Sequence, residues 1–269
     1  MTATDKTVPL LSDPGLRQFQ EDGFTVVRGL FSSDEIDRLC AEFAALHAGG
    51  PVPGHFEPGE SADPLRRYPR VMHPHEISDL SRRLLLDPRL GDVLERLLGE
   101  EVLAAQSMFY FKPPGARGQA LHQDNFYLRV EPGTCVAAWV ACDVIDRDNG
   151  GLEVVPGTHR MDLFCPEEAD PEVSFAREYV APPPGLAAVP VDMAPGDVLF
   201  FNGSVVHGSQ PNRTTDRFRR SFIGHYVGAS AERIGHYYRT MSMSGERVSL
   251  LESEGAGPCG TEFAPQGPH

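Results

Sequence analysis

Long apolar runs are the first feature that this sequence lacks. No stretch approaches the roughly 18–20 consecutive apolar residues that a membrane-spanning helix needs. Residues 1–13 are polar and do not show the basic and then apolar segments of a secretory signal peptide. These absences argue against a membrane partner and predict a cytoplasmic protein.

Closely spaced cysteines and an excess of basic residues are also missing. The five cysteines are scattered without a CxxC motif, which argues against a disulfide scaffold and a thiolate zinc site. The formal net charge is -14, and because phosphate contacts need clustered Lys and Arg, we expect no nucleic-acid partner. There is no GxxxxGK[ST] motif and no alternation of strands with helices, so the common nucleotide-binding folds are disfavoured.

The length and the patterning predict a single domain over residues 1–269. Apolar residues at helical spacing favour a helical N-terminal part over about 13–98. Short β-prone runs favour a core over about 101–230, and residues 231–269 form a C-terminal extension. The expected fold class is therefore mainly β with flanking helices.

Several helix boundaries can be placed from the sequence. Asp13-Pro14 is a plausible helix start, and Ser32 with Glu35 resembles a capping box at the start of a second helix. Two more helices are predicted over 77–86 and 87–98, the second with a proline in its first turn.

The β-prone runs are short and are separated by Gly- and Pro-containing turns, which indicates a β-sandwich or barrel. We expect strands at 25–30, 102–112, 121–130, 134–142, 151–156, 187–192, 197–202 and 220–227. Two Pro-rich segments, 51–69 and 161–186, interrupt the pattern and are candidate lids.

The sequence His122-Gln123-Asp124 is the clearest candidate for chemistry. If it lies on a β-strand, side chains alternate, so His122 and Asp124 point the same way. His207, downstream, is the best candidate for a third ligand, and two histidines with one carboxylate form the facial triad of non-haem iron(II) oxygenases. Taken alone, the pair is more typical of a solvated polar face, and His207 is more typical of a core residue.

Four stretches together resemble the phytanoyl-CoA dioxygenase (PhyH) family of Fe(II)/2-oxoglutarate-dependent oxygenases. They span roughly residues 20–230, and their order and spacing match those of the family. The stretches are Lys112-Pro113-Pro114-Gly115 leading into Leu121-His122-Gln123-Asp124, Trp139 within 136–143, Asn149-Gly150-Gly151-Leu152 continuing to Pro156-Gly157-Thr158-His159, and His207-Gly208-Ser209-Gln210-Pro211-Asn212 followed by Arg219-Arg220-Ser221.

This resemblance implies a double-stranded β-helix, a cupin-like jelly roll with the N-terminal helices packed on it. It implies that His122, Asp124 and His207 are the catalytic iron ligands. Arg219 would pair with the distal carboxylate of the co-substrate 2-oxoglutarate, since a guanidinium donates two parallel hydrogen bonds to a carboxylate. Ser221, on the same strand face, would donate another bond.

The position of this arginine departs from the family by one residue. The family usually has it one residue closer to the distal histidine, so Arg219 fits only if the preceding loop is one residue longer. Arg220 is the rival, but strand alternation turns it outward if Arg219 faces inward.

Five other positions match family residues that contact 2-oxoglutarate or line its pocket. Each has a plainer interpretation as a core, buried-strand or solvated loop residue, and Gln123 would point away from its neighbours on a regular strand. They are Met108, Trp139, Ser209, Gln123 and Arg70.

The function implied by the resemblance is an oxidoreductase that uses O₂ and 2-oxoglutarate, with ascorbate as a candidate stimulant. It would hydroxylate an unactivated C–H bond of a small molecule or secondary metabolite and release succinate and CO₂. Related halogenases replace the carboxylate ligand by Gly or Ala, and Asp124 is retained here. The alternatives are an acyl-CoA hydroxylase, a cupin-like isomerase or epimerase, and a metal-free binding module. The sequence does not predict the oligomeric state.

Overall fold

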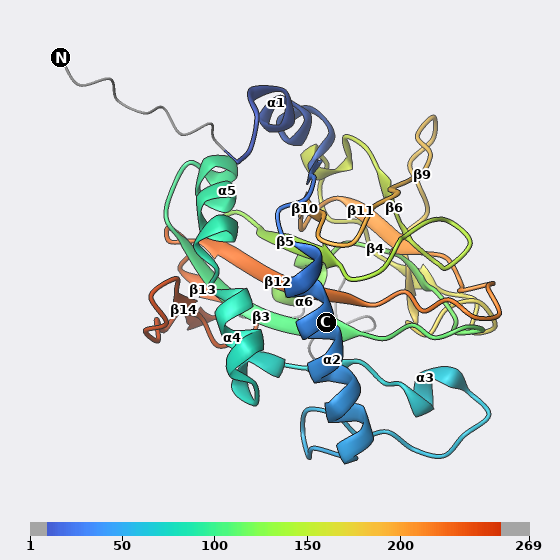
Figure 1. Ribbon diagram of the computed structural model, residues 1–269. Helices are drawn as coiled ribbons and strands as arrows, with labels where there is room; N and C mark the ends of the chain where they lie inside the picture. Colours follow the sequence, from blue (N-terminus) through green and yellow to red (C-terminus); the bar gives the residue numbers. More distant parts are fainter. Residues whose placement is uncertain (1–9, 254–269) are drawn as a thin grey trace.

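The computed structural model describes residues 10–253 (Figure 1). The helices are α1 Asp13–Asp22, α2 Ser33–Gly49, α3 Pro64–Arg67, η1 Pro74–Glu76, α4 Asp79–Leu85, α5 Pro88–Leu98, α6 Asn125–Leu128 and η2 Thr158–Arg160. The strands are β1 Phe24–Val27, β2 Val71–Met72, β3 Val102–Tyr110, β4 Gln119–His122, β5 Cys135–Ala141, β6 Leu152–Val155, β7 Glu167–Glu168, β8 Glu178–Tyr179, β9 Val189–Pro190, β10 Val198–Asn202, β11 Val206–Ser209, β12 Ser221–Gly228, β13 Arg233–Ile234, β14 Met241–Ser242 and β15 Leu251–Glu252.

Two antiparallel sheets form the jelly roll. The larger one, here called the major sheet, has the order β1-β10-β5-β12-β3-β14, and β2 also pairs with β3. The minor sheet has the order β4-β11-β6-β9. Consecutive neighbours in each sheet are far apart in sequence, which is the crossover pattern of a jelly roll. The predicted double-stranded β-helix is therefore confirmed.

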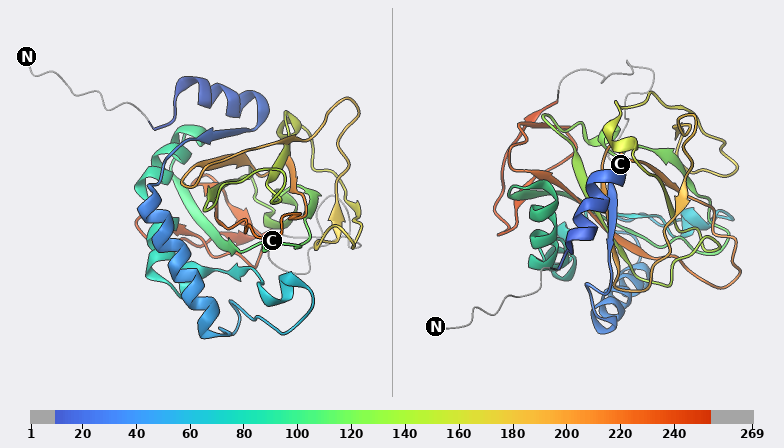
Figure 2. Two further views of the ribbon diagram at one scale, coloured as in Figure 1. Left: turned by 45° about the vertical axis from the view of Figure 1, so that its right-hand side comes forward. Right: turned by 90° about the horizontal axis from the view of Figure 1, so that it is seen from above.

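The strands of the major sheet are buried on both faces, because helices cover one face and the minor sheet covers the other. On β3, Phe109 points outward and stacks on Phe43 of α2 with ring centroids 3.7 Å apart. Its neighbour Met108 points inward to a second cluster that includes Trp139 and Leu152. Figure 2 shows α2, α4 and α5 gathered on one side of the sheet. The N-terminal helices thus shield the outer face of the wall behind the site.

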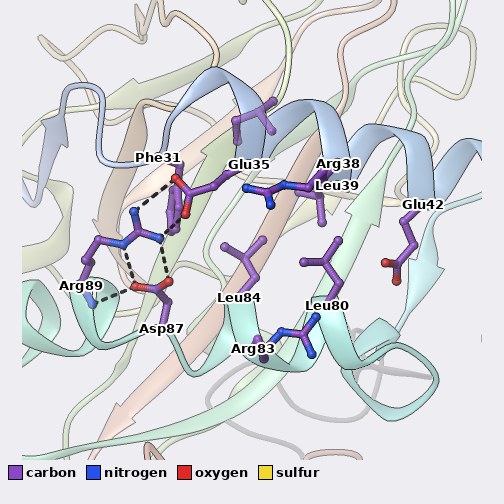
Figure 3. Close-up of a pocket in the computed structure, with 11 residues that line it drawn as sticks. Phe31, Glu35, Arg38, Leu39, Glu42, Leu80, Arg83, Leu84, Asp87 and Arg89 are labelled. Atoms are coloured by element: carbon purple, nitrogen blue, oxygen red, sulfur yellow. Dashed lines mark hydrogen bonds and ion pairs between the residues drawn. The ribbon is translucent and has the colours of Figure 1, made fainter.

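The predicted capping box anchors α2 and links it to α5. Ser32 Oγ accepts from the Glu35 backbone N–H, and the Glu35 carboxylate accepts from the Ser32 backbone N–H at 2.8 Å. The same carboxylate pairs with Arg89, which also pairs with Asp87 (Figure 3). Hydrogen bonds from Arg89 lower the pKa of Glu35 to about 2. These residues border a cavity of about 570 Å³ between α2 and α4.

The predicted strand over 121–130 is wrong beyond His122. The strand β4 ends at His122, and the short helix α6 begins at Asn125. Asp124 has helical backbone angles, φ -61° and ψ -36°. The residues Asn125 to Leu128 are fully buried, and their apolar character reflects this burial rather than a strand.

The three predicted parts of the chain are interwoven in the major sheet. The helical part contributes β1 at one edge and β2, which pairs with β3. The predicted extension contributes β14 at the other edge, where Met241 pairs with Ala104. The polar N-terminal residues 1–9 and residues 254–269 of the extension lie outside the described residues.

The structure bears on the expected absence of membrane-spanning helices and on the expected state of the cysteines. Within residues 10–253, none of the helices has the length and apolar character needed to cross a bilayer. Cys40, Cys135 and Cys142 are free thiols, whereas Cys165 is disulfide-bonded, which the scattered cysteines did not predict.

The capping box makes a testable contribution to stability. Ser32→Ala is expected to lower the free energy of unfolding by about 1 kcal/mol, because an N-terminal N–H of α2 loses its acceptor. Chemical denaturation measures this difference. Ser33→Ala, on the exposed first residue of α2, is the matched control. Equal losses in the two variants would contradict a capping role for Ser32.

Candidate active site

The site begins with a pair of histidines on adjacent strands of the minor sheet. In the register of β4 with β11, His122 lies directly opposite His207, and their ring centroids are 4.3 Å apart. Both residues are 3% exposed. Directly opposed residues in an antiparallel pair are close neighbours, so two histidines far apart in sequence meet.

Each histidine is held in one tautomer by its own strand. His122 Nδ1 is 2.8 Å from the Ala120 carbonyl oxygen, and His207 Nδ1 is 3.0 Å from the Val205 carbonyl oxygen. A carbonyl only accepts, so both Nδ1 atoms carry hydrogen and donate. Both Nε2 atoms therefore present lone pairs in the neutral rings. The side-chain amide of Gln119 lies 3.1 Å from His122 Nε2 and donates to it.

Asp124 supplies the carboxylate from the turn after β4. Its Oδ1 is 3.5 Å from His122 Nε2 and 3.4 Å from His207 Nε2, and the residue is 1% exposed. The prediction that His122 and Asp124 face one site is correct, but strand alternation is not the reason. The helical turn at Asp124, which starts α6, brings the carboxylate back over the imidazoles.

His225 is a functional candidate that the sequence analysis did not assign. Its Nε2 lies 3.0 Å from Asp124 Oδ2, and the residue is 1% exposed. This contact holds the carboxylate so that Oδ1, not Oδ2, faces the two imidazoles. The signal was present in the sequence, because His225 and Ser221 are four residues apart on one strand and therefore share a face.

The electrostatics of this cluster favour a positive charge at its centre. Burial lowers the pKa of His122, and the adjacent His207 lowers it further. Burial also disfavours the charged form of His207, but the negative charge of Asp124 outweighs it and raises that pKa. The three ligand atoms lie within 4.8 Å of one another. Two imidazole nitrogens and one carboxylate oxygen on one face fit a metal of the non-haem iron class.

A buried arginine lines the same cavity as the three potential ligands. Arg219 is 3% exposed, and its guanidinium carbon lies 5.3 Å from the centre of the Trp139 ring. Burial lowers its pKa to about 10, so it stays charged at neutral pH. Arg220 points elsewhere and forms an ion pair with Asp143 at 2.6 Å. Arg219 therefore faces the cavity and Arg220 does not, as predicted, although both residues precede β12 and do not lie on a strand.

The cavity around the triad is small. Its volume is about 30 Å³, room for only a few water molecules. Met108 and Trp139 line it, as expected from the sequence. Phe175, from the predicted lid segment 161–186, also lines it. A co-substrate with several carbon atoms therefore requires lining side chains to move.

The remaining predicted residues do not line this cavity. Gln123 turns away, because its amide donates to the Ser204 carbonyl and accepts from the Phe164 N–H. Ser221 lies behind Arg219 and accepts from its Nη1 at 3.0 Å. Arg70 donates to the hydroxyl of Tyr110, which does line the cavity.

Ser209 is engaged from behind by a lysine to which the sequence analysis gave no role. Lys112 is 2% exposed, and its Nζ donates to Ser209 Oγ at 2.8 Å. Burial, and then the charge of Arg219, hold the pKa of Lys112 well below its usual range. The sequence signal for a buried Lys112 was its position between the apolar residues Phe111 and Pro113.

Comparisons with known proteins agree with this geometry. Residues 19–221 match the family described as Phytanoyl-CoA dioxygenase (PhyH). The chain is 30% identical over 231 residues to the peroxisomal phytanoyl-CoA dioxygenase of Rattus norvegicus, covering 80% of this chain and 68% of that protein. It is 28% identical over 229 residues to the ectoine dioxygenase of Bordetella bronchiseptica (strain ATCC BAA-588 / NCTC 13252 / RB50), covering 77% of this chain and 72% of that one.

A solved structure gives the same result for the fold. The crystal structure of the epimerase SnoN in complex with Fe3+, alpha ketoglutarate and nogalamycin RO superimposes with a TM-score of 0.64 at 25% identity, covering 82% of this chain and 84% of that one. The family match includes the whole minor sheet, the major sheet up to the start of β12, and all three potential ligands. The chain therefore belongs to the PhyH family of Fe(II)/2-oxoglutarate-dependent dioxygenases.

Proposed function

We propose that this enzyme hydroxylates an unactivated C–H bond of a small molecule, with iron held by His122, Asp124 and His207. The observation that carries the proposal is the convergence of two Nε2 lone pairs and Asp124 Oδ1 in one buried cluster. Such a set of convergent acceptors favours a cation between them. The carboxylate also fills a ligand position that related halogenases leave open, which favours oxygen transfer.

We propose Arg219 as the partner of the distal carboxylate of 2-oxoglutarate. Its guanidinium is buried in the same cavity as the triad, and within residues 10–253 it bonds only to neutral acceptors, the Gly150 carbonyl at 3.1 Å and Ser221 Oγ at 3.0 Å. A planar guanidinium offers two parallel donors to a carboxylate. The stacking distance to Trp139 supports a fixed orientation for it.

The protein's contribution to the reaction is positioning and exclusion of water. When bound, the iron supplies the redox chemistry by which O₂ and 2-oxoglutarate give succinate and CO₂ and the substrate R–H becomes R–OH. His225 holds the Asp124 carboxylate, and the Nδ1 hydrogen bonds hold the two imidazoles. The buried apolar residues around Met108 and Trp139 exclude water from the site and so prevent side reactions with it.

The charge of the chain bears on the substrate class. A CoA thioester would need a basic surface for its phosphates, and the chain carries a net charge of -14. This balance favours a small molecule or secondary metabolite over an acyl-CoA. An epimerisation is the second candidate outcome, because the chain is similar to a solved epimerase. The products formed from candidate substrates distinguish the two outcomes.

The first test is turnover of 2-oxoglutarate without a primary substrate. Enzyme with Fe(II), O₂ and ascorbate is expected to release succinate slowly, and His122→Ala or Asp124→Ala is expected to remove this release because the iron site loses a ligand. Succinate is quantified by chromatography. If the wild type neither releases succinate nor binds 2-oxoglutarate anaerobically, the proposed oxygenase function is refuted.

The adjacent arginines give a matched pair for the co-substrate. Arg219→Ala is expected to weaken 2-oxoglutarate binding by about 100-fold, because a charge-assisted pair with a carboxylate is lost. Arg220→Ala is expected to leave that binding unchanged and to lower stability by about 1 kcal/mol, because its ion pair with Asp143 is partly exposed. Anaerobic calorimetry measures the binding. The opposite pattern would show that Arg220 is the co-substrate ligand.

His225 gives a test of the metal site itself. His225→Phe is expected to weaken anaerobic Fe(II) binding by roughly 10- to 100-fold, because the Asp124 carboxylate loses the partner that orients it. The control is His236→Phe on the exposed surface. Unchanged Fe(II) affinity in His225→Phe would mean that this histidine does not position Asp124.

A further inference from the structure

Two buried cations lie beside each other close to the site. Lys112 is 2% exposed and Arg219 is 3% exposed. The Arg219 backbone N–H donates to the Lys112 carbonyl at 3.1 Å, and the charge of Arg219 lowers the pKa of Lys112. In the part of the chain that the structure describes, neither side chain has a carboxylate within ion-pairing distance. Buried charge of one sign without a counter-ion is costly, so this arrangement calls for an anion.

The turn at Gly150 allows the two cations to lie this close. Gly150 has φ +77°, a conformation that side chains rarely adopt. Its carbonyl accepts from Arg219 Nε at 3.1 Å, while a Cβ on it would lie 2.9 Å from Lys112 Nζ. Lys112 itself has φ +37°, which is unfavourable for a residue other than glycine. The backbone is therefore strained in order to bring the lysine to this place.

Lys112 determines what the hydroxyl of Ser209 can do. Ser209 Oγ accepts from Lys112 Nζ at 2.8 Å and from the Gln119 backbone N–H at 3.3 Å. A hydroxyl has two lone pairs and one hydrogen, so both acceptor positions are used and only donation remains. Among residues 10–253, no acceptor lies within bonding distance of that hydrogen. Ser209 and His207 are two residues apart on β11 and share its inward face.

Glu153 is the carboxylate whose charge acts on Lys112, and it already accepts a hydrogen bond. Its charge raises the pKa of Lys112, but burial and the charge of Arg219 outweigh it. Its carboxylate accepts from Gln210 Nε2 at 2.7 Å. Glu153 thus does not neutralise the pair formed by Lys112 and Arg219.

We propose that Lys112 is a positioning residue for the oxo-acid. A bound distal carboxylate favours the charged form of Lys112, whose ammonium group then fixes Ser209 Oγ as a donor toward that carboxylate and adds a second positive charge behind Arg219. This inference rests on the proposed function, because it assigns the co-substrate as the missing anion. The proposal explains why Lys112 is buried where, among the described residues, its ammonium group bonds to a neutral acceptor and to no carboxylate.

The test compares two oxo-acids that differ only at the distal end. In anaerobic Fe(II) enzyme, Lys112→Met is expected to weaken 2-oxoglutarate binding by about 10- to 100-fold, because a charge-assisted contact is lost. Binding of 2-oxopentanoate, which has a methyl group in place of the distal carboxylate, is expected to stay unchanged. Arg117→Met is the control, since Arg117 lies on the same segment but pairs with Asp63. Equal loss for both acids, or no loss for either, would overturn the inference.

Stability of the ligand-free protein separates positioning from a structural role. Lys112→Met is expected to leave the melting temperature unchanged or to raise it, because a buried charge without a counter-ion is removed. A lysine that served mainly the fold would give a lower melting temperature. Ser209→Ala keeps the lysine and removes the hydroxyl, and it is expected to show the same selective loss of 2-oxoglutarate binding. If Ser209→Ala binds the two acids with the same affinities as the wild type, Lys112 does not act through Ser209.

A direct measurement is available in the wild type. Lys6 and Lys112 are the only lysines in the sequence, so protein labelled with ε-¹³C lysine gives two side-chain signals. In the Zn(II)-substituted enzyme, the Lys112 signal is expected to shift with 2-oxoglutarate and not with 2-oxopentanoate. If 2-oxoglutarate binds but neither acid shifts the Lys112 signal, the inference is overturned. If the wild type does not bind 2-oxoglutarate at all, the proposed function fails as well.

Discussion

The pairing of β4 with β11 is the constraint on which the site depends. It sets His122 opposite His207, and a slip of one residue would turn one imidazole to the other face of the sheet. Gly208 fixes this pairing, because a Cβ at that position would lie 2.8 Å from the Gln119 carbonyl oxygen and 3.0 Å from the Leu121 nitrogen. The two strands can approach this closely only with glycine there. Asp124 and His225 then build on a pair of imidazoles whose positions are already determined.

Local patterns predicted most of the fold, and the errors occur where distant parts of the chain decide the structure. The capping box at Ser32 is a local signal, and the opposite directions of the neighbouring side chains Arg219 and Arg220 are another, so both were predictable. The turn at Asp124 was not, because buried Asn125–Leu128 has the apolar composition of a strand. The roles of His225 and Lys112 depend on contacts with Asp124 and Ser209, which are 101 and 97 residues away. Such pairings cannot be obtained from spacing along the chain.

The charge of the whole chain and the charge of the site have opposite signs. The sequence carries a net charge of -14, yet the residues behind the cavity include Lys112 and Arg219. Long-range attraction cannot bring a dianion to such a protein, since surface charges act on the encounter and favour cations. Selection of an oxo-acid therefore depends on short-range contacts in a desolvated pocket, where electrostatic interactions are strongest. Net charge therefore affects the surface and the encounter, whereas short-range contacts decide which small ion a buried site binds.

The place of β3 in the major sheet has a consequence for biosynthesis. This strand pairs with β2, β12 and β14, so its partners extend from residue 71 to residue 242. Contacts that span so much of the chain form slowly, and they cannot form until the ribosome has released the last strand. Met108 on β3 is one wall of the cavity, and His207 and His225 also come late in the chain. The nascent chain therefore has no complete iron site until His207 and His225 have left the ribosome.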